Sequence, residues 1–563
     1  MRRPSRRLAS RRRPEAAHRV LDDHHTPGRK SIPVRFTAAA DSLSSVSSFT
    51  EKSKSPIRVS VVVPVFNPGP SFDDLIASLD RQSLRPDQFE ILLCDDGSDD
   101  ATRKRLDDVA QDRPHVRVLN LPHSGWPGTP RNEGVDAAQG AYVQFVDQDD
   151  YLFDTALEKL TDYADANGSD VVVGKEVGIG RPLPRRIFRR DIPDAVLGED
   201  PLLEMLTPHK MFRTAFLREH GIRFPDGRVR LEDHLYVMQA YFAASRISIL
   251  ASVPCYAWVK QAGSASSSRI EPETYFPHLE TVLDVVEQNT EPGRVRDRLL
   301  RHWFRGKILT RLSGRRMVRY PDEYRTRLLD TVTPLVEKRF GPGVDAGLAF
   351  PQRIRAALLR AGKRDDLVRF AEFEDSLECQ ATVTAASWSR GGGLHLSLDV
   401  GVTRDGREAL IFDPETGRLS SLPLESVNDL PTAALVAGKE RSNDRVEVFV
   451  VGDEPGSERR VASERLRDRG TVSVSIDPLK VFGGAGATVR LTAKVRMAGW
   501  TFDVPVTADA ALLARAGASP FLAGSPVTLA AGPDGAVSLR RAGSGGLRDL
   551  AGRAARKARA RRG

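Results

Sequence analysis

The sequence is poor in cysteine and has no long apolar run. Its 563 residues include three cysteines, Cys94, Cys255 and Cys379, an odd and widely spaced set that offers neither a disulfide framework nor the spacing of a zinc site. We expect all three to be reduced thiols. No stretch approaches the roughly 18 to 20 apolar residues that span a bilayer, and the Arg-rich start lacks the apolar segment of a secretion signal. We therefore expect a cytoplasmic protein.

Sequence signatures of two other protein classes are also missing. The chain has no helix-turn-helix, zinc-finger or aromatic RNA-binding signature, so no nucleic-acid partner is expected. The G-x-G-x-x-G fingerprint of dinucleotide-dependent oxidoreductases is absent, because Leu183 stands where the third glycine would follow Gly178 and Gly180. A binding protein for nucleic acid or another anionic polymer remains the non-enzymatic alternative.

The net charge of +9 is concentrated at the two ends. Residues 1–30 hold ten Lys or Arg against three acids, and residues 541–563 hold eight against one. Each end contributes +7, so removing twice +7 from +9 leaves the remainder at −5. Basic ends predict an anionic partner, such as an acidic polymer or a membrane surface at the inner face of the cell membrane. The alternative is a solvated tail that aids solubility.

Periodicity divides the chain into five segments. Residues 1–55 are rich in Arg and Ser without apolar periodicity, which predicts a disordered tail. Residues 56–271 alternate strand and helix patterns, which predicts an α/β domain with a doubly wound, mostly parallel sheet. Residues 272–375 have helical spacing, and residues 376–540 alternate with a period of two, which predicts a helical linker and an all-β sandwich. Residues 541–563 form the second basic tail.

Three polar turns follow predicted strands in the α/β segment. They are the end of the run 61–67, the turn 95–98 (Asp-Asp-Gly-Ser) and the turn 147–150 (Asp-Gln-Asp-Asp). Parallel strands carry their ligand-binding loops at their carboxyl ends, so these turns should lie side by side at one edge of the sheet. One acidic turn can then hold a nucleoside and another a metal ion.

The turn 147–150 has the chemistry of a divalent-metal site. A nucleotide-sugar donor develops negative charge on its diphosphate as the bond to the sugar breaks, and a cation held by carboxylates neutralises that charge. Asp147, Asp149 and Asp150 supply hard oxygen ligands that suit Mg²⁺ or Mn²⁺. Alternatively, Asp149 and Asp150 are solvated residues that start the following helix.

The turn 95–98 contains a candidate for nucleoside binding. We expect Asp96 to accept hydrogen bonds from a base or ribose, whereas Asp95 or Ser98 caps a helix that begins near Ala101. In this interpretation Asp96 is functional and Ser98 is structural.

Aromatic and basic residues complete the candidate donor site. Pro64 and Phe66 end the first strand, where they either pack on a uracil ring or belong to the core. The turn-rich loop 123–132 opens a helix, and Arg131 at its start is placed to meet an acceptor or a phosphate, because the helix dipole and the guanidinium both favour anions.

A separate acidic pair, Glu232 and Asp233, precedes an amphipathic helix. An inverting sugar transfer needs a base on the acceptor side to take the hydroxyl proton. Asp233 is the candidate for this base. The alternative is that both acids only interact favourably with the dipole of the helix that follows.

Taken together, these motifs resemble those of the family 2 inverting glycosyltransferases with the GT-A fold. Within that family, segments 124–132, 207–214 and 246–250 are similar to the branch that adds β-linked N-acetylglucosamine to the poly(ribitol phosphate) of wall teichoic acid. The resemblance runs from about residue 59 to 268. It implies a UDP-sugar donor, an anionic polyol-phosphate polymer as acceptor, a C-terminal immunoglobulin-like sandwich and a homo-oligomer, with a trimer as one form.

The resemblance also assigns roles to individual residues. Asp233 is the implied general base beside Glu232, and Asp149 is the implied ligand of Mn²⁺ or Mg²⁺. Lys260 opens a segment to residue 267 that matches a mobile loop closing over the diphosphate. The full implied substrate-binding set is Pro64, Phe66, Asp96, His123, Arg131, Asp147, Gln148, Asp149, Glu232 and Lys260. A capsule or exopolysaccharide transferase on the same fold is the alternative within the enzyme class.

Overall fold

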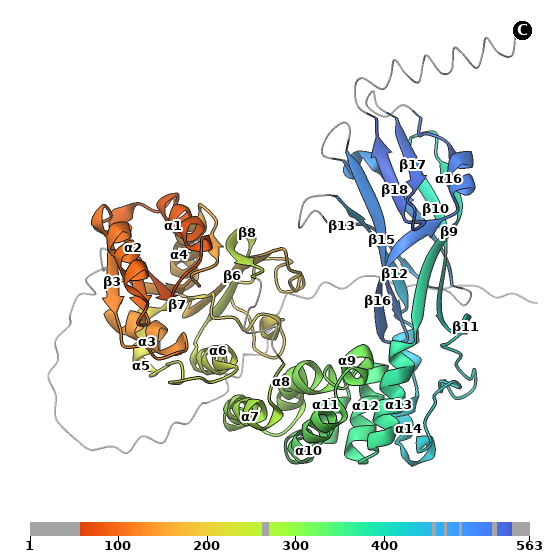
Figure 1. The fold of residues 1–563 in the computed structure, drawn as a ribbon, viewed down its shortest axis with the longest axis horizontal. Coiled ribbons are helices and arrows are strands. Elements are labelled where there is room, and N and C mark those ends of the chain that lie inside the picture. The colour runs from red at the N-terminus through yellow and green to blue at the C-terminus, as the bar shows by residue number, and fades with distance from the viewer. Residues whose placement is uncertain are drawn as a thin grey trace, which may run out of the picture. The chain divides into compact units, whose positions relative to one another are not determined.

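The computed structural model describes most of the chain between residues 57 and 542. The described ranges are 57–261, 269–452, 458–466, 470–482, 487–520 and 526–542. The predicted tail 1–55, nearly all of the predicted tail 541–563, and the loop after Lys260 as far as residue 267 lie outside them, apart from Gln261. Figure 1 shows three kinds of structure along the chain: an α/β region, a helical region and a strand-rich region.

The α/β region is built on an eight-stranded sheet with the order β3-β2-β1-β4-β7-β6-β8-β5. Strands β3, β2, β1 and β4 pair in parallel, as do β6 and β8. The short strands β7 and β5 pair antiparallel to their neighbours. The strands are β1 (Val59–Val65), β2 (Phe89–Asp95), β3 (Val116–Asn120), β4 (Tyr142–Phe145), β5 (Tyr151–Leu152), β6 (Val171–Ile179), β7 (Met211–Arg213) and β8 (Ile247–Val259).

Helices follow the strands as the sequence pattern predicts. Every residue of β1 and β2 is buried, which is typical of central parallel strands covered on both faces. The covering helices are α1 (Ser71–Asp80), α2 (Asp100–Gln111), α3 (Gly128–Ala137), α4 (Ala156–Asn167), α5 (Thr214–Glu219) and α6 (Glu232–Ala243). The predicted Rossmann-like α/β fold with a mostly parallel sheet is therefore confirmed, and its antiparallel strands make it a mixed sheet.

One detail of the first acidic turn differs from the prediction. Neither Asp95 nor Ser98 caps α2, because Asp99 holds the N-cap position and its carboxylate accepts a hydrogen bond from the backbone N–H of Thr102 at 2.8 Å. Ser98 instead accepts a hydrogen bond from the backbone N–H of Asn67 at 3.0 Å. Its predicted structural role is therefore correct, but it joins two loops and caps no helix.

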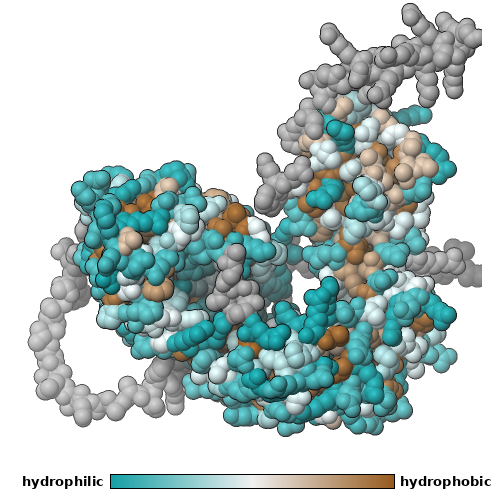
Figure 2. Space-filling model, viewed as in Figure 1, coloured by the Kyte–Doolittle hydropathy of each residue, from teal (hydrophilic) through white to brown (hydrophobic). Residues whose placement is uncertain are grey.

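The helical region follows as a bundle of seven α-helices and a π-helical turn. These are α7 (Pro272–Gln288), α8 (Arg294–Trp303), the turn Phe304–Leu309, α9 (Gly314–Val318), α10 (Asp322–Arg339), α11 (Pro342–Asp345), α12 (Phe350–Arg360) and α13 (Arg364–Asp375). Trp303, Phe304 and Phe340 are fully buried and anchor its core. In Figure 2 the surface of this region is largely hydrophilic.

The strand-rich region closes around a second core of alternating apolar residues. Its strands are β9 (Glu378–Trp388), β10 (Leu394–Arg404), β11 (Arg407–Glu408), β12 (Arg445–Val451), β13 (Arg459–Arg465), β14 (Thr471–Ile476), β15 (Thr488–Met497), β16 (Trp500–Ala508), β17 (Val527–Ala531) and β18 (Val537–Arg541). Strand β16 joins β9 to β15 in the connected sheet. In the described part of this region, three short α-helices interrupt the expected all-β pattern: α14 (Thr432–Leu435), α15 (Gly438–Arg441) and α16 (Ala510–Ala516).

Two further findings concern the cysteines and the helices of the described residues. Cys94, Cys255 and Cys379 are free thiols, and the first two are buried. Among the helices that the structure describes, none combines the length and the apolar character needed to cross a bilayer.

Candidate active site

The carboxyl edge of the sheet carries an exposed aromatic platform. Phe66 directly follows β1 and is 43% exposed. Its ring stacks on His123 with a centroid distance of 4.5 Å and an angle of 26°. Gln148 fixes the backbone of Phe66, since its side-chain amide both accepts from the N–H at 2.8 Å and donates to the C=O at 3.2 Å. A stacked, exposed pair of rings can receive a nucleobase on its open face.

The loop that carries His123 is tied to Asp96. The Asp96 carboxylate accepts hydrogen bonds from the backbone N–H and hydroxyl of Ser124, at 2.8 and 2.6 Å, and from the N–H of Gly125 at 3.0 Å. His123 Nδ1 lies 2.7 Å from the Asp96 carbonyl oxygen. Both carboxylate oxygens are therefore engaged within the protein, and Asp96 positions the loop that presents the aromatic platform.

Asp147 lies at the centre of a buried charge network after β4. Its carboxylate accepts from Arg131 Nη2 at 2.6 Å and lies 3.2 Å from His209 Nε2. His209 Nδ1 faces the buried Glu176 at 3.3 Å. Burial alone would lower the pKa of His209, but Glu176 and Asp147 raise it to about 10. The same two cations, Arg131 and His209, hold the pKa of Asp147 below its ordinary value against the opposite effect of burial.

The three acids of the turn 147–150 have different environments. Asp150 is buried and accepts from the Tyr256 hydroxyl and the Val259 N–H, both at 2.7 Å, and burial raises its pKa to about 7. Asp149 is half-buried, and within residues 57–261 no side chain donates a hydrogen bond to its carboxylate. Burial raises the pKa of Asp149, and the charge of Asp147 adds to the effect.

These acids could hold a divalent metal ion. Asp147, Asp150 and His209 each offer one ligand atom within 4.8 Å of the others. His209, however, lies between two carboxylates, so its ring nitrogens both act as donors and neither has a lone pair for a metal. Carboxylate oxygens at this turn, with Asp149 the least engaged of them, therefore fit a hard cation better than the imidazole does.

The candidate base lies on the other side of Arg131. Glu232 and Asp233 form the first turn of α6, and Glu232 Oε1 lies 4.0 Å from Arg131 Nη1. Burial and the charge of Asp233 raise the pKa of Glu232 to about 7. Burial also raises the pKa of Asp233, whereas the charges of Lys307 and Arg131 oppose that rise. Arg131 thus bridges the acids of the predicted donor turn and those of the predicted acceptor side.

Pro64, Lys260 and Arg131 are also predicted to belong to the substrate site. Pro64 is buried inside β1, where its missing N–H costs no ladder bond because the pairing of β1 with β4 ends at Val62. Lys260 directly follows β8 and has an exposed side chain. Arg131, by contrast, is 4% exposed and bound to Asp147, so its guanidinium is not open to an acceptor in this structure.

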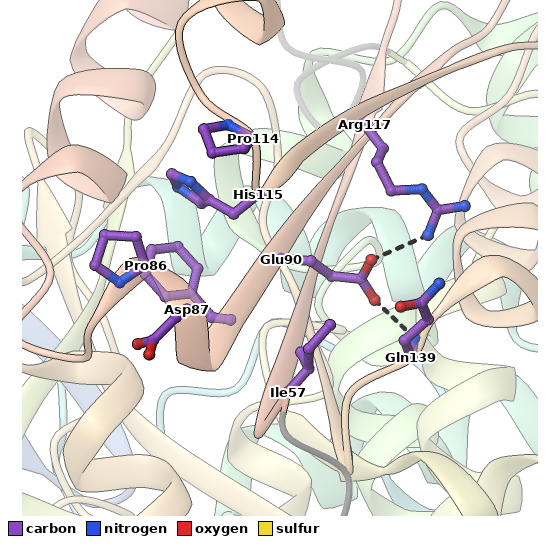
Figure 3. Close-up of a pocket in the computed structure, with 9 residues that line it drawn as sticks. Ile57, Pro86, Asp87, Glu90, Pro114, His115, Arg117 and Gln139 are labelled. Atoms are coloured by element: carbon purple, nitrogen blue, oxygen red, sulfur yellow. Dashed lines mark hydrogen bonds and ion pairs between the residues drawn. The ribbon is translucent and has the colours of Figure 1, made fainter.

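A pocket of about 450 Å³ opens at the opposite edge of the same sheet (Figure 3). Its lining includes Glu90, whose carboxylate accepts from Ser60, from the N–H of Gln139 and from Arg117. The complete lining is Ile57, Pro86, Asp87, Phe89, Glu90, Pro114, His115, Arg117 and Gln139. None of the residues predicted for the site is among them, so this pocket is separate from the carboxyl-edge site.

Sequence reasoning missed four residues of the network. His209 and Glu176 complete the charge pairs, Tyr256 joins Asp150 to the backbone of Asp147, and Arg181 stacks 3.5 Å above the Trp258 ring near the acids. The segment Thr207-Pro208-His209-Lys210 is the one signal in the sequence for His209, and it carries a family resemblance without indicating a role for the imidazole. Glu176 and Tyr256 lie inside apolar strand patterns that carry no sign of a site.

The fold, with acidic turns at the carboxyl edge of its sheet, is like that of the GT-A class of glycosyltransferases. Residues 60–231 match the sequence profile of Glycosyl transferase family 2, and residues 272–371 match that of the Glycosyl transferase TarS linker domain. The chain thus carries a family 2 glycosyltransferase domain and resembles TarS of Staphylococcus aureus.

The matches to curated relatives cover about two fifths of the chain. TarS of S. aureus, a poly(ribitol-phosphate) beta-N-acetylglucosaminyltransferase, is 34% identical over 223 residues, which are 39% of each chain. The poly(ribitol-phosphate) beta-glucosyltransferase of Bacillus spizizenii is 32% identical over 234 residues, or 41% of this chain and 37% of the relative. The chain therefore spans less than two fifths of the length of these relatives.

Solved structures support the fold. Residues 1–349 of S. aureus TarS in complex with UDP-GlcNAc superpose with a TM-score of 0.52 at 24% identity, covering 62% of this chain and 98% of that one. A second S. aureus TarS structure gives a TM-score of 0.52 at 19% identity and covers 86% of this chain and 85% of that one. This second match extends the fold likeness beyond the catalytic domain.

Proposed function

We propose that the chain is an inverting glycosyltransferase that moves a sugar from a UDP-sugar to a hydroxyl of a polyol-phosphate polymer of the teichoic acid type. N-acetylglucosamine is the proposed sugar. The observation that supports the proposal best is that Arg131 contacts both Asp147, in the same turn as Asp149, and Glu232, the neighbour of Asp233. Arg131 would join a donor-side acidic turn to an acceptor-side base within one site.

Asp233 is the proposed catalytic base. Its carboxylate accepts one hydrogen bond from the N–H of His234, at 2.8 Å, and retains lone pairs for a hydroxyl proton. Burial raises its pKa toward the operating range of a base, which strengthens it as a proton acceptor. As the acceptor oxygen attacks the anomeric carbon, its proton passes to Asp233 and the UDP leaves on the opposite face. Arg131 and Glu232 position the carboxylate.

Asp149 is the proposed metal ligand, with Mn²⁺ or Mg²⁺ as the ion. Such an ion would neutralise charge on the leaving diphosphate. Asp149→Asn is expected to weaken Mn²⁺ binding by about tenfold or more. Even the loss of a residue that only hydrogen-bonds to a metal ligand commonly lowers metal affinity by about that factor. His209→Gln is the comparison variant and should weaken Mn²⁺ binding less than Asp149→Asn does, because the imidazole has no lone pair free for the ion. Equilibrium binding of Mn²⁺ measured by electron paramagnetic resonance distinguishes the two, and the reverse result would assign the site to the imidazole.

The function is tested by UDP release from UDP-N-acetylglucosamine in the presence of Mn²⁺, with and without poly(ribitol phosphate). Release should require the polymer and should fall by about 10²- to 10⁴-fold in Asp233→Asn, the usual contribution of a general base. Hydrolysis that is indifferent to the polymer would point to another acceptor. Absence of turnover with any UDP-sugar would return the chain to the anionic-polymer-binding alternative.

A glucose donor is the second candidate. The B. spizizenii relative, named for glucosyl transfer, is about as similar to this chain as TarS is. Competing UDP-glucose against UDP-N-acetylglucosamine at equal concentration would separate the two donors by their kcat/KM ratio.

The assembly is also part of the proposal. We propose a homo-oligomer formed through the strand-rich C-terminal region, with a trimer as one form, and peripheral contact of the basic ends with an anionic membrane. Light scattering of the full chain tests the first part. A mass of more than one protomer is the expected result, and a monomer would contradict it.

A further inference from the structure

The helical region carries a concentration of positive charge that no carboxylate within the described ranges pairs with, although some of these cations donate hydrogen bonds to backbone carbonyl groups. Residues 294–319 hold ten Lys or Arg and a single acid, Asp297, which gives this segment a net charge of +9. None of the ten cations forms an ion pair with a carboxylate within the described ranges. Other cations of this region are paired; Arg327 and Arg339, for example, each contact two or more acids.

One set of these cations begins beside the proposed base. The π-helical turn Phe304–Leu309 directly follows Trp303. Trp303 Nε1 donates a hydrogen bond to Nδ1 of His234 in α6 at 3.1 Å, and His234 is the residue after Asp233. Lys307 on this turn is partly buried and faces Asp233. Burial lowers the pKa of Lys307, and the charge of Asp233 counteracts that effect.

The set continues along the chain to Arg311. Its Nη1 donates to the Lys307 carbonyl oxygen at 2.6 Å, and its guanidinium lies 4.8 Å from the centre of the Tyr275 ring. The hydrogen bond to the Lys307 carbonyl oxygen and the contact with the Tyr275 ring thus hold the Arg311 guanidinium about one helical turn from Lys307. No carboxylate within the described ranges neutralises it.

Arg316 extends the row away from the base. Burial raises the pKa of the Tyr320 phenol, and the charges of Arg316, Arg311 and Arg269 oppose that rise. Arg315 and Arg316 then line a pocket of about 530 Å³ together with the hydroxyls of Thr310 and Ser313 and the indole of Trp500. Glu374 also lines it, but Arg355 pairs with that carboxylate at 2.6 Å.

The partly buried, unpaired cations of this row differ from those of an ordinary solvated basic helix. Exposed cations normally spread apart or pair with acids, because mutual repulsion between unpaired like charges destabilises the fold. Here Lys307 and Arg311 are partly buried, and three cations follow one another from the base to a pocket with hydroxyl groups. Guanidinium and ammonium groups at successive turns match a ligand with repeated phosphates, and the hydroxyls match a polyol between them.

We infer that Lys307, Arg311 and Arg316 form the track on which the phosphates of the acceptor polymer bind, so that the helical region presents successive repeats to Asp233. This inference rests on the proposed function and adds the location of the acceptor. The catalytic domain alone would then bind the donor normally but would hold a long acceptor weakly.

The double variant Arg311→Gln/Arg316→Gln tests the track. Two readouts are taken in parallel: direct binding of fluorescently labelled poly(ribitol phosphate), and UDP release from UDP-N-acetylglucosamine as the polymer is titrated. The variant should raise both the Kd and the KM for the polymer about tenfold at low salt and should lose much of the wild-type salt sensitivity. Donor KM and kcat at saturating polymer should stay as in the wild type.

A matched control removes the same charge elsewhere. Arg459→Gln/Arg465→Gln changes two exposed arginines on β13, the edge strand of the C-terminal sheet. Equal weakening in this control would reduce the effect to net charge and overturn the inference, as would a wild-type Kd in the test variant. The single variant Arg316→Gln, which changes an exposed residue, serves if the double variant folds poorly.

The two readouts separate the inference from the proposed function. Polymer binding that depends on Arg311 and Arg316 without any sugar transfer would sustain the track and contradict the transfer. Transfer to the polymer with unchanged binding in the variant would sustain the function and contradict the track.

Discussion

The three aspartates of the turn 147–150 differ in how many partners their carboxylates have within the protein. Asp147 is bound by Arg131 and His209, and Asp150 by Tyr256 and a backbone N–H. Asp149 is the member of the turn whose carboxylate is left without a donor side chain in residues 57–261. A carboxylate that the protein has not satisfied is the one available to an incoming cation, so the role proposed for Asp149 follows from its neighbours rather than from its charge.

Lys307 should set the pH at which the proposed base works. The base must be deprotonated to accept a proton, and burial raises the pKa of Asp233 while Lys307 opposes that rise. In Lys307→Met the pKa of Asp233 rises further. As the pH falls, Asp233 is then protonated earlier, and activity is lost at a higher pH than in the wild type. The acid limb of the kcat/KM profile is therefore expected to move to higher pH.

The profile is measured as UDP release between pH 5 and pH 9. Lys307→Arg keeps the positive charge and should keep the wild-type limb. A limb that stays in place in Lys307→Met would mean that Asp233 does not respond to this charge, or that Asp233 is not the group that titrates.

At the scale of elements, α3 illustrates how tightly the site depends on packing against the sheet. Gly134 of α3 lies over β1 and β2, and a Cβ at this position would overlap the Val62 side chain and lie 3.0 Å from Cys94 Sγ. Both partners are fully buried and belong to the sheet. The helix can approach this closely because the residue has no side chain.

Gly134→Ala is therefore expected to destabilise the protein by about 1–3 kcal/mol, the usual cost of overpacking a core. It should also reduce UDP release, because Arg131 lies one turn earlier on the same helix and would shift away from Asp147. Urea unfolding and the UDP assay measure the two effects. Gly306→Ala, where no atom lies within 4 Å of the new Cβ, should leave stability equal or raised by up to about 1 kcal/mol. Equal effects of both substitutions would refute the packing argument.

The elements that could be predicted are those whose pattern is local. The buried strands β1, β2 and β4, the helix after each, and the change to a period of two near residue 376 all follow from side-chain spacing. The short antiparallel strand β7 has three residues and no pattern of its own, so sequence reasoning did not find it. His209 precedes β7, and its contacts with Glu176 and Asp147 span 33 and 62 residues, so they depend on a sheet order that local patterns do not specify.

On the scale of the whole molecule, the helical region and the strand-rich region share a hydrophobic core. Trp500, the first residue of β16, packs edge-on against Phe350 of α12 with a centroid distance of 5.6 Å and also lies near Phe370 and Phe373 of α13. Its indole N–H donates to Glu374 at 3.1 Å. Because burial is shared between the two regions, we expect them to unfold together.

Trp500→Ala should make the helical region and the strand-rich region unfold in separate transitions. The substitution opens a cavity among Phe350, Phe370 and Phe373 and removes a hydrogen bond from the buried Glu374, at a cost of about 3–5 kcal/mol. Since the loss falls on the shared core, scanning calorimetry should resolve two transitions where the wild type shows one for these regions. Trp388→Ala is the matched control, because Trp388 ends β9 and donates to Gly517 within the strand-rich region, and it should lower one transition without dividing it. A single transition in Trp500→Ala, lowered no more than in the control, would show that the regions are coupled through other contacts.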